Sequence, residues 1–136
     1  MSANTTPIFT LTPRNAYITT GTSANTNLDG TGTVATVVTA GTNGSYINRV
    51  RITHLGTNVA TVVRLFVNNG STNTTASNNA LVYEVAIPAN TLSQTAASTA
   101  YDIPLDLRLA ASYKINATIG TACAAGLMVA IELGDY

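Results

Sequence analysis

The sequence predicts an all-β fold, a two-sheet antiparallel sandwich that is jelly-roll-like and has about eight or nine strands. Three observations indicate this fold. Apolar and polar residues alternate with period 2 along most of the 136 residues, as expected of strands with one buried face. Thr, Ala and Asn are abundant whereas Lys occurs once; Thr and Val favour strands, and the rarity of Lys removes a usual residue of helix surfaces. The connections are irregular and unequal in length, which favours a Greek-key or jelly-roll arrangement over a simple meander.

The first 30 residues differ from the rest of the chain. They contain little apolar sequence, and Pro13 separates two weak strand candidates, residues 8–12 and 16–20. We therefore predict that residues 1–30 are an N-terminal arm or edge strands, and that residues 31–136 form the β-sandwich domain. As an arm, this segment would become ordered on a neighbouring molecule.

Four strands are predicted in the middle of the chain. Residues 34–39 are a short candidate, and Val50 and Ile52 alternate with Arg49 and Arg51 in the next one. Residues 59–67 are apolar on both faces, so something must cover each face. The fourth predicted strand has Glu84 on its outer face. Its inner row consists of Leu81, Tyr83, Val85 and Ile87.

The last third of the chain alternates most regularly. Residues 103–109, 113–119 and 127–133 place apolar side chains at every second position. Asp-Gly or Asn-Gly pairs at 29–30, 43–44 and 69–70 supply turn residues that accept positive φ. Residues 70–79 and 90–100 are polar, lack periodicity and are predicted to be loops. Across the protein, we expect the inner rows to include Val63, Leu65, Val85, Ile103, Leu105, Leu107, Val129 and Ile131.

The charge content narrows the function classes. Only 9% of residues are charged and the formal net charge is +0, so the chain lacks the clustered Lys and Arg that bind nucleic acid or anionic membranes. We expect neither as a partner. The N-terminal sequence does not resemble a secretory signal and no apolar stretch is long enough to span a bilayer, so we expect a soluble product of a reducing cytoplasm.

The chemistry-bearing residues are few. His54 is the single histidine and is expected at the rim of the sandwich, hydrogen-bonded to backbone. Cys123 is the single cysteine and is expected to be a small buried apolar side chain. Asp102 and Asp106 lie on the same face of their predicted strand, and we expect both to be solvated charges on its outer face. The sequence contains none of the familiar phosphate-, metal- or nucleophile-bearing motifs. We therefore expect no enzyme activity, with no catalytic residues, no cofactor and no metal.

The arginines are candidates for a binding surface. Arg49, Arg51 and Arg64 lie on outward rows of two successive apolar strands. If those strands pair, the three guanidinium groups gather on one face, and Arg is enriched at protein interfaces. The alternative is ordinary surface ion pairs with Glu84, Asp102 or Asp106. Phe66 lies on the second apolar face of residues 59–67 and is the fourth interface candidate, because that face could contact a neighbouring subunit.

Three segments resemble a known group of proteins. They are YINRVRITHLGTNVATVVRLFVNNGSTN (46–73), YEVAIPANTLSQTA (83–96) and YDIPLDLRLAASYKINATIGTACAAGLMVAIELGDY (101–136). Together they resemble small structural proteins of tailed bacteriophages, among them capsid cement, or decoration, proteins of cyanophage-like viruses. The resemblance covers about two-thirds of the chain, mainly from residue 46 onward, and no motif in it is chemically diagnostic.

The resemblance implies a virion structural protein, made in the host cytoplasm and located on the capsid surface. It implies a jelly-roll sandwich that forms a homotrimer, binds the outside of the phage head and bridges major capsid protein subunits. A phage tail, baseplate or fibre component is the alternative. A carbohydrate-binding module is a weaker one, because Trp is absent and aromatic residues make up 6% of the chain.

Overall fold

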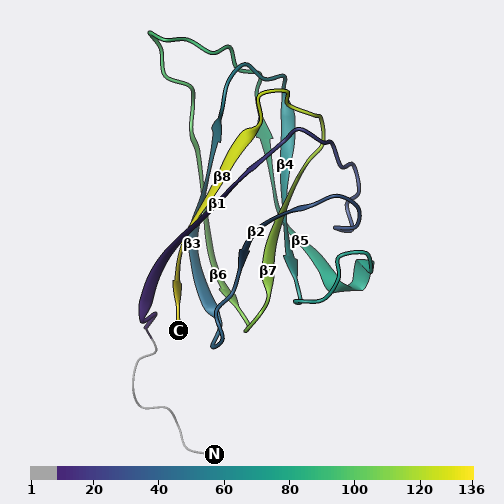
Figure 1. Cartoon of the computed structure of the whole chain (residues 1–136), viewed down its shortest axis with the longest axis vertical. Coiled ribbons are helices and arrows are strands. Elements are labelled where there is room, and N and C mark those ends of the chain that lie inside the picture. The colour runs from purple at the N-terminus through teal and green to yellow at the C-terminus, as the bar shows by residue number, and fades with distance from the viewer. Residues whose placement is uncertain (1–8) are drawn as a thin grey trace, which may run out of the picture.

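The computed structural model describes residues 9–136 and is all-β, with eight strands in two antiparallel sheets of four (Figure 1). The predicted two-sheet sandwich is confirmed. The strands are β1 (Thr12–Thr20), β2 (Ala35–Thr39), β3 (Ser45–His54), β4 (Thr61–Asn68), β5 (Asn79–Ile87), β6 (Tyr101–Leu109), β7 (Lys114–Ile119) and β8 (Leu127–Asp135). In the described part of the chain, the single helical element is the 3-10 turn η1 (Ala76–Asn78).

The strand order is that of a jelly roll. The first sheet has the order β1-β8-β3-β6 and the second has the order β2-β7-β4-β5. Strand β1 thus pairs with β8, β2 with β7, β3 with β6 and β4 with β5. A chain that pairs in this nested way is a long antiparallel ribbon wound into two sheets, which is the eight-stranded double Greek key.

The core between the sheets consists of the inner rows that the alternation predicts. Val63, Leu65, Ile103, Val129 and Ile131 are almost completely buried. Val85, Leu105 and Leu107 are partly buried and pack against this cluster. These eight residues are the predicted set, so period-2 alternation placed each of them on the core side of its strand correctly.

The inner row predicted for β5 is wrong at one end. The pairing of β4 with β5 shifts register between Leu65 and Phe66, which leaves Val82 as an extra residue in β5. Leu81 therefore lies opposite Phe66, on the outer face of the sheet, while Tyr83 remains opposite Leu65. A one-residue bulge reverses the facing of every residue beyond it.

The connection between β1 and β2, residues 21–34, crosses the outer face of the second sheet (Figure 1). The backbone N–H of Asn25 donates to the Ile119 carbonyl at 2.8 Å, and a guanidinium N–H of Arg64 donates to the Asn25 carbonyl at 3.5 Å. The β4–β5 connection meets it, because the Asn73 amide donates to the Gly32 carbonyl at 2.8 Å. We call residues 21–34 the cover segment.

Residues 1–30 were predicted to be an arm or edge strands. Residues 12–20 form β1, an edge strand of the first sheet, and residues 21–30 belong to the cover segment. The sandwich thus includes strand residues that the predicted boundary at residue 31 left out. Residues 1–8, also assigned to the arm, lie outside the described residues.

Candidate interaction surface

The outer face of the first sheet carries a row of polar side chains that we call the arginine face. It consists of Tyr17 on β1, Glu132 on β8, Arg49 and Arg51 on β3, and Asp102 on β6. Each alternates with an inward apolar residue of its strand, so the pleat directs it away from the core. The sheet register places Arg51 opposite Asp102 and Arg49 opposite Glu132.

Two ion pairs fix the arginines in place. The Arg51 guanidinium donates to both oxygens of the Asp102 carboxylate, at 2.7 and 2.8 Å. This bidentate contact lowers the pKa of Asp102 and raises that of Arg51. Arg49 Nε lies 2.6 Å from Glu132 Oε2. All four side chains are about half exposed, and such pairs add little stability. Their main effect is to hold two planar guanidinium groups at the surface in defined orientations.

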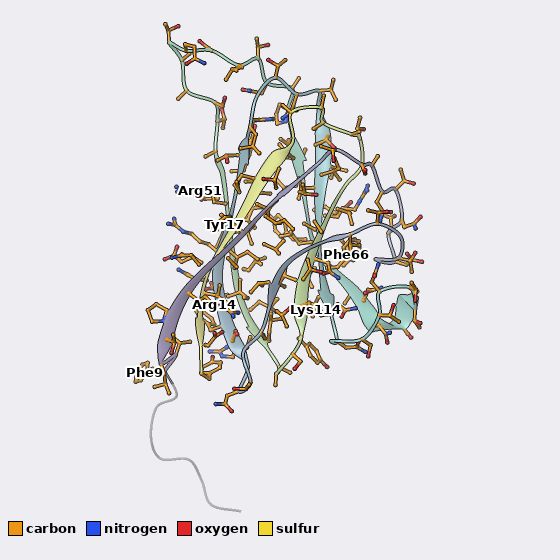
Figure 2. All side chains as sticks on the ribbon, viewed as in Figure 1. Phe9, Arg14, Tyr17, Arg51, Phe66 and Lys114 are labelled. Carbon is orange, nitrogen blue, oxygen red and sulfur yellow. The ribbon has the colours of Figure 1, made fainter. Side chains whose placement is uncertain are left out.

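Tyr17 lies next to these pairs and is largely exposed. Its side chain is 71% exposed, and it borders a shallow depression of about 200 Å³ that Arg49, Arg51 and Glu132 also line. Figure 2 shows Arg51 projecting from the first-sheet side of the molecule, while Phe66 lies on the second-sheet side. An exposed aromatic ring beside ordered guanidinium groups is the composition typical of the energetically dominant part of a protein–protein contact.

A second group of aromatic residues lies at the end of this sheet. The Tyr46 hydroxyl donates to Asp106 Oδ1 at 2.5 Å, a contact that raises the pKa of Tyr46. The Arg108 guanidinium lies over the Tyr46 ring, 5.6 Å from its centroid. Phe9 and Tyr136 line the adjoining depression, and Phe9 is 74% exposed. This group extends the exposed surface beyond the arginine face.

The structure separates the three candidate arginines. Arg49 and Arg51 lie together on the arginine face, but Arg64 lies on β4 in the other sheet, where its Nε is 2.7 Å from Glu84 Oε1. The expectation that all three gather on one face is wrong, because β3 and β4 are consecutive in the chain but do not pair. The ion pairs proposed as the alternative do form for Arg51 with Asp102 and for Arg64 with Glu84.

Phe66 is not an accessible interface residue. It is completely buried and does not belong to the core between the sheets. It lies on the outer face of β4, in the row that includes Arg64, where the cover segment packs. The prediction that its face is free to contact a neighbour is wrong, because the chain itself covers that face. Phe66 consequently gives no support to the predicted homotrimer.

His54 and Cys123 have structural surroundings. His54 lies at the end of β3, and its Nδ1 is 3.4 Å from the amide nitrogen of Asn58, a side-chain contact in place of the expected backbone one. Partial burial lowers its pKa. Cys123 is completely buried, as predicted, with its Sγ 3.6 Å from the Val59 carbonyl oxygen. Burial raises the pKa of this thiol, which keeps it protonated.

Two residues of the arginine face, Tyr17 and Glu132, were not predicted from the sequence. Tyr17 alternates with the inward-facing Ala16 and Ile18, so an aromatic residue in an outward row was the available signal. Nothing local marks Glu132, because its partner Arg49 is on another strand. Within residues 9–136, no three His, Cys, Asp or Glu side chains form a group that could hold a metal ion, and no helix there is long and apolar enough to span a membrane.

Comparisons with known proteins add no relative. No protein-family model, no curated protein and no solved structure matches this chain. The features that bear on function are therefore the geometry of the arginine face and the composition of the chain.

Proposed function

We propose that this protein is a virion structural protein, a capsid cement or decoration protein that binds the outside of a phage head and bridges major capsid protein subunits. The observation that supports a binding role is the asymmetry of the sandwich. One outer face is covered by the chain itself, whereas the arginine face is exposed in the part of the chain that the structure describes and has Tyr17 and two ordered guanidinium groups. The assignment to a virion is inferred from the resemblance, not from the jelly-roll fold, which hosts many functions.

The physical basis of such binding is a neutral surface presented many times. With a net charge of +0, identical molecules do not repel one another on a lattice. If each molecule bridges two shell subunits, two modest contacts act together, and the second forms at high effective concentration. In this proposal the protein binds and stabilises, and it catalyses no reaction.

The test is co-sedimentation of the purified protein with phage heads that lack it, and separately with purified tails. We expect binding to heads, and Arg51→Ala should weaken that binding about tenfold if Arg51 belongs to the dominant part of the contact. Arg64→Ala is the matched control, because Arg64 lies on the other sheet. Binding to tails but not heads would favour a tail, baseplate or fibre component. Binding to neither would refute a virion role.

A further inference from the structure

The two sheets have four edge strands, namely β1 and β6 in the first sheet and β2 and β5 in the second. An edge strand leaves one row of backbone N–H and C=O groups without a partner strand, so that it can pair with another chain. Natural proteins block this pairing with proline, charged side chains, short strands, bulges or a covering segment. The four edges differ in how well they are blocked.

Three of the edges have clear protection. Strands β1 and β2 approach each other closely along one side of the sandwich. In addition, β1 contains Pro13, and β2 has five residues and a register shift. Strand β6 contains Pro104, and its Asp106 has a positive φ of 46°, at the point where the pairing of β6 with β3 shifts register. Asp102, Asp106 and Arg108 also place charges on β6.

Strand β5 is the least protected edge. It has nine residues, contains no proline and has a single charged residue, Glu84. Leu81, Val82 and Tyr83 are 39%, 39% and 41% exposed, although all are large and apolar. The bulge at Val82 leaves residues 83–87 in regular pairing with β4. A regular apolar edge of this kind is a template for another strand.

The two sheets are also farther apart on the side of the sandwich where β5 and β6 lie. Strands β5 and β6 do not approach each other closely, in contrast to β1 and β2 on the opposite side. Inward-facing residues on this open side are consequently only partly buried, among them Val85 on β5 and Leu107 on β6. A strand added next to β5 would cover part of this apolar surface as well as the free backbone groups.

We propose that β5 of one molecule pairs with β5 of a second copy of this chain. The other three edges are blocked, so the matching free edge on a second copy is its own β5. A two-fold axis perpendicular to the strand makes the pair antiparallel without further adjustment, as in isologous dimers. This contact gives a dimer, where the phage-protein resemblance implies a trimer, and it does not depend on the virion role.

The distribution of charge on β5 favours a second copy of this chain as its partner. The one carboxylate on β5, that of Glu84, is already paired with Arg64 at 2.7 Å. A two-fold axis near Val85 keeps the two Glu84 carboxylates off directly opposite positions, and like charges directly opposite each other would destabilise the pair. The two copies therefore meet through an edge that has no uncompensated charge.

The test combines light scattering after size exclusion with amide hydrogen exchange, at protein concentrations from about 1 to 500 µM. We expect a concentration-dependent dimer in which residues 83–87 exchange more slowly than in the diluted monomer. Val82→Lys should raise the dimer dissociation constant about tenfold, because it places an ammonium group next to the paired residues 83–87, and a lysine on an edge strand opposes pairing with another strand. Val59→Lys is the matched control, since Val59 is also exposed but lies outside the strands, and it should leave the dimer intact.

Three results would overturn the proposal. They are a protein that stays monomeric across the whole range, a trimer, and a dimer that Val82→Lys leaves unchanged. Protection of residues 83–87 only after phage heads are added would instead assign β5 to a shell partner. The wild-type dilution series tests the contact even if Val82→Lys fails to fold. Because the dilution series needs no phage particle, its failure leaves the head-binding test unaffected.

Discussion

The two outer faces of the sandwich differ in whether the chain covers them. The outer face of the second sheet includes the apolar Phe66, which is completely buried, and the cover segment crosses this face and bonds to Arg64 in the same row. The outer face of the first sheet contains Arg49, Arg51 and their carboxylate partners, and it stays open. The difference follows from the outward side chains. Burying an apolar ring lowers the free energy of the folded state, whereas covering a solvated ion pair lowers it little. A face that the chain leaves bare is the better candidate for a partner.

The largest effect should come from removing the ring beneath the cover segment. Phe66→Ala should reduce the free energy of unfolding by about 3–5 kcal/mol, because it leaves a cavity where a fully buried ring packed. Tyr17→Ala is the matched control on the bare face and should change stability by less than about 0.5 kcal/mol. Urea denaturation followed by circular dichroism measures both values. Similar losses for the two variants would remove the proposed difference between the faces.

A smaller effect should come from the polar contacts that shape the cover segment. The buried Asn25 amide donates to the carbonyls of Thr31 and Thr33, at 2.8 Å each. Asn25→Ala leaves both carbonyls without this donor, so we expect a loss of about 1–3 kcal/mol. Asn27→Ala, at an exposed position of the same segment, should cost less in the same urea titration. Equal losses would mean that the inward amide does not organise the segment.

The smallest effect should be the acid sensitivity of the arginine face. The hydrogen bonds from Arg51 lower the pKa of Asp102 in the folded protein. Its stabilising contribution is therefore complete above the unfolded-state pKa, about 3.9, and is lost as the pH falls through the lower folded-state pKa. Asp102→Asn should show a slightly smaller loss of stability between pH 5 and pH 2 than the wild type, measured by urea midpoints. An unchanged or steeper pH dependence would contradict this assignment.

The sequence by itself determined which side of each regular strand faces the core. Side chains in a strand alternate strictly between two faces, so the positions of residues such as Leu65, Ile103 and Ile131 follow from local spacing alone. The same rule placed Arg49 and Arg51 on one outward row, and they are two of the five residues of the arginine face. It failed at Leu81, where a bulge in β5 interrupts the alternation.

The tertiary structure decided which strands are neighbours and what lies over each sheet. Alternation contains no information about strand order, so it could not show that β3 and β4 belong to different sheets, or that Glu132 lies beside Arg49. It also could not show that residues 21–34 cross the outer face of the second sheet, although it correctly indicated that both faces of β4 need a cover. These features depend on contacts between residues far apart in the chain, which form only when the whole ribbon winds into its two sheets.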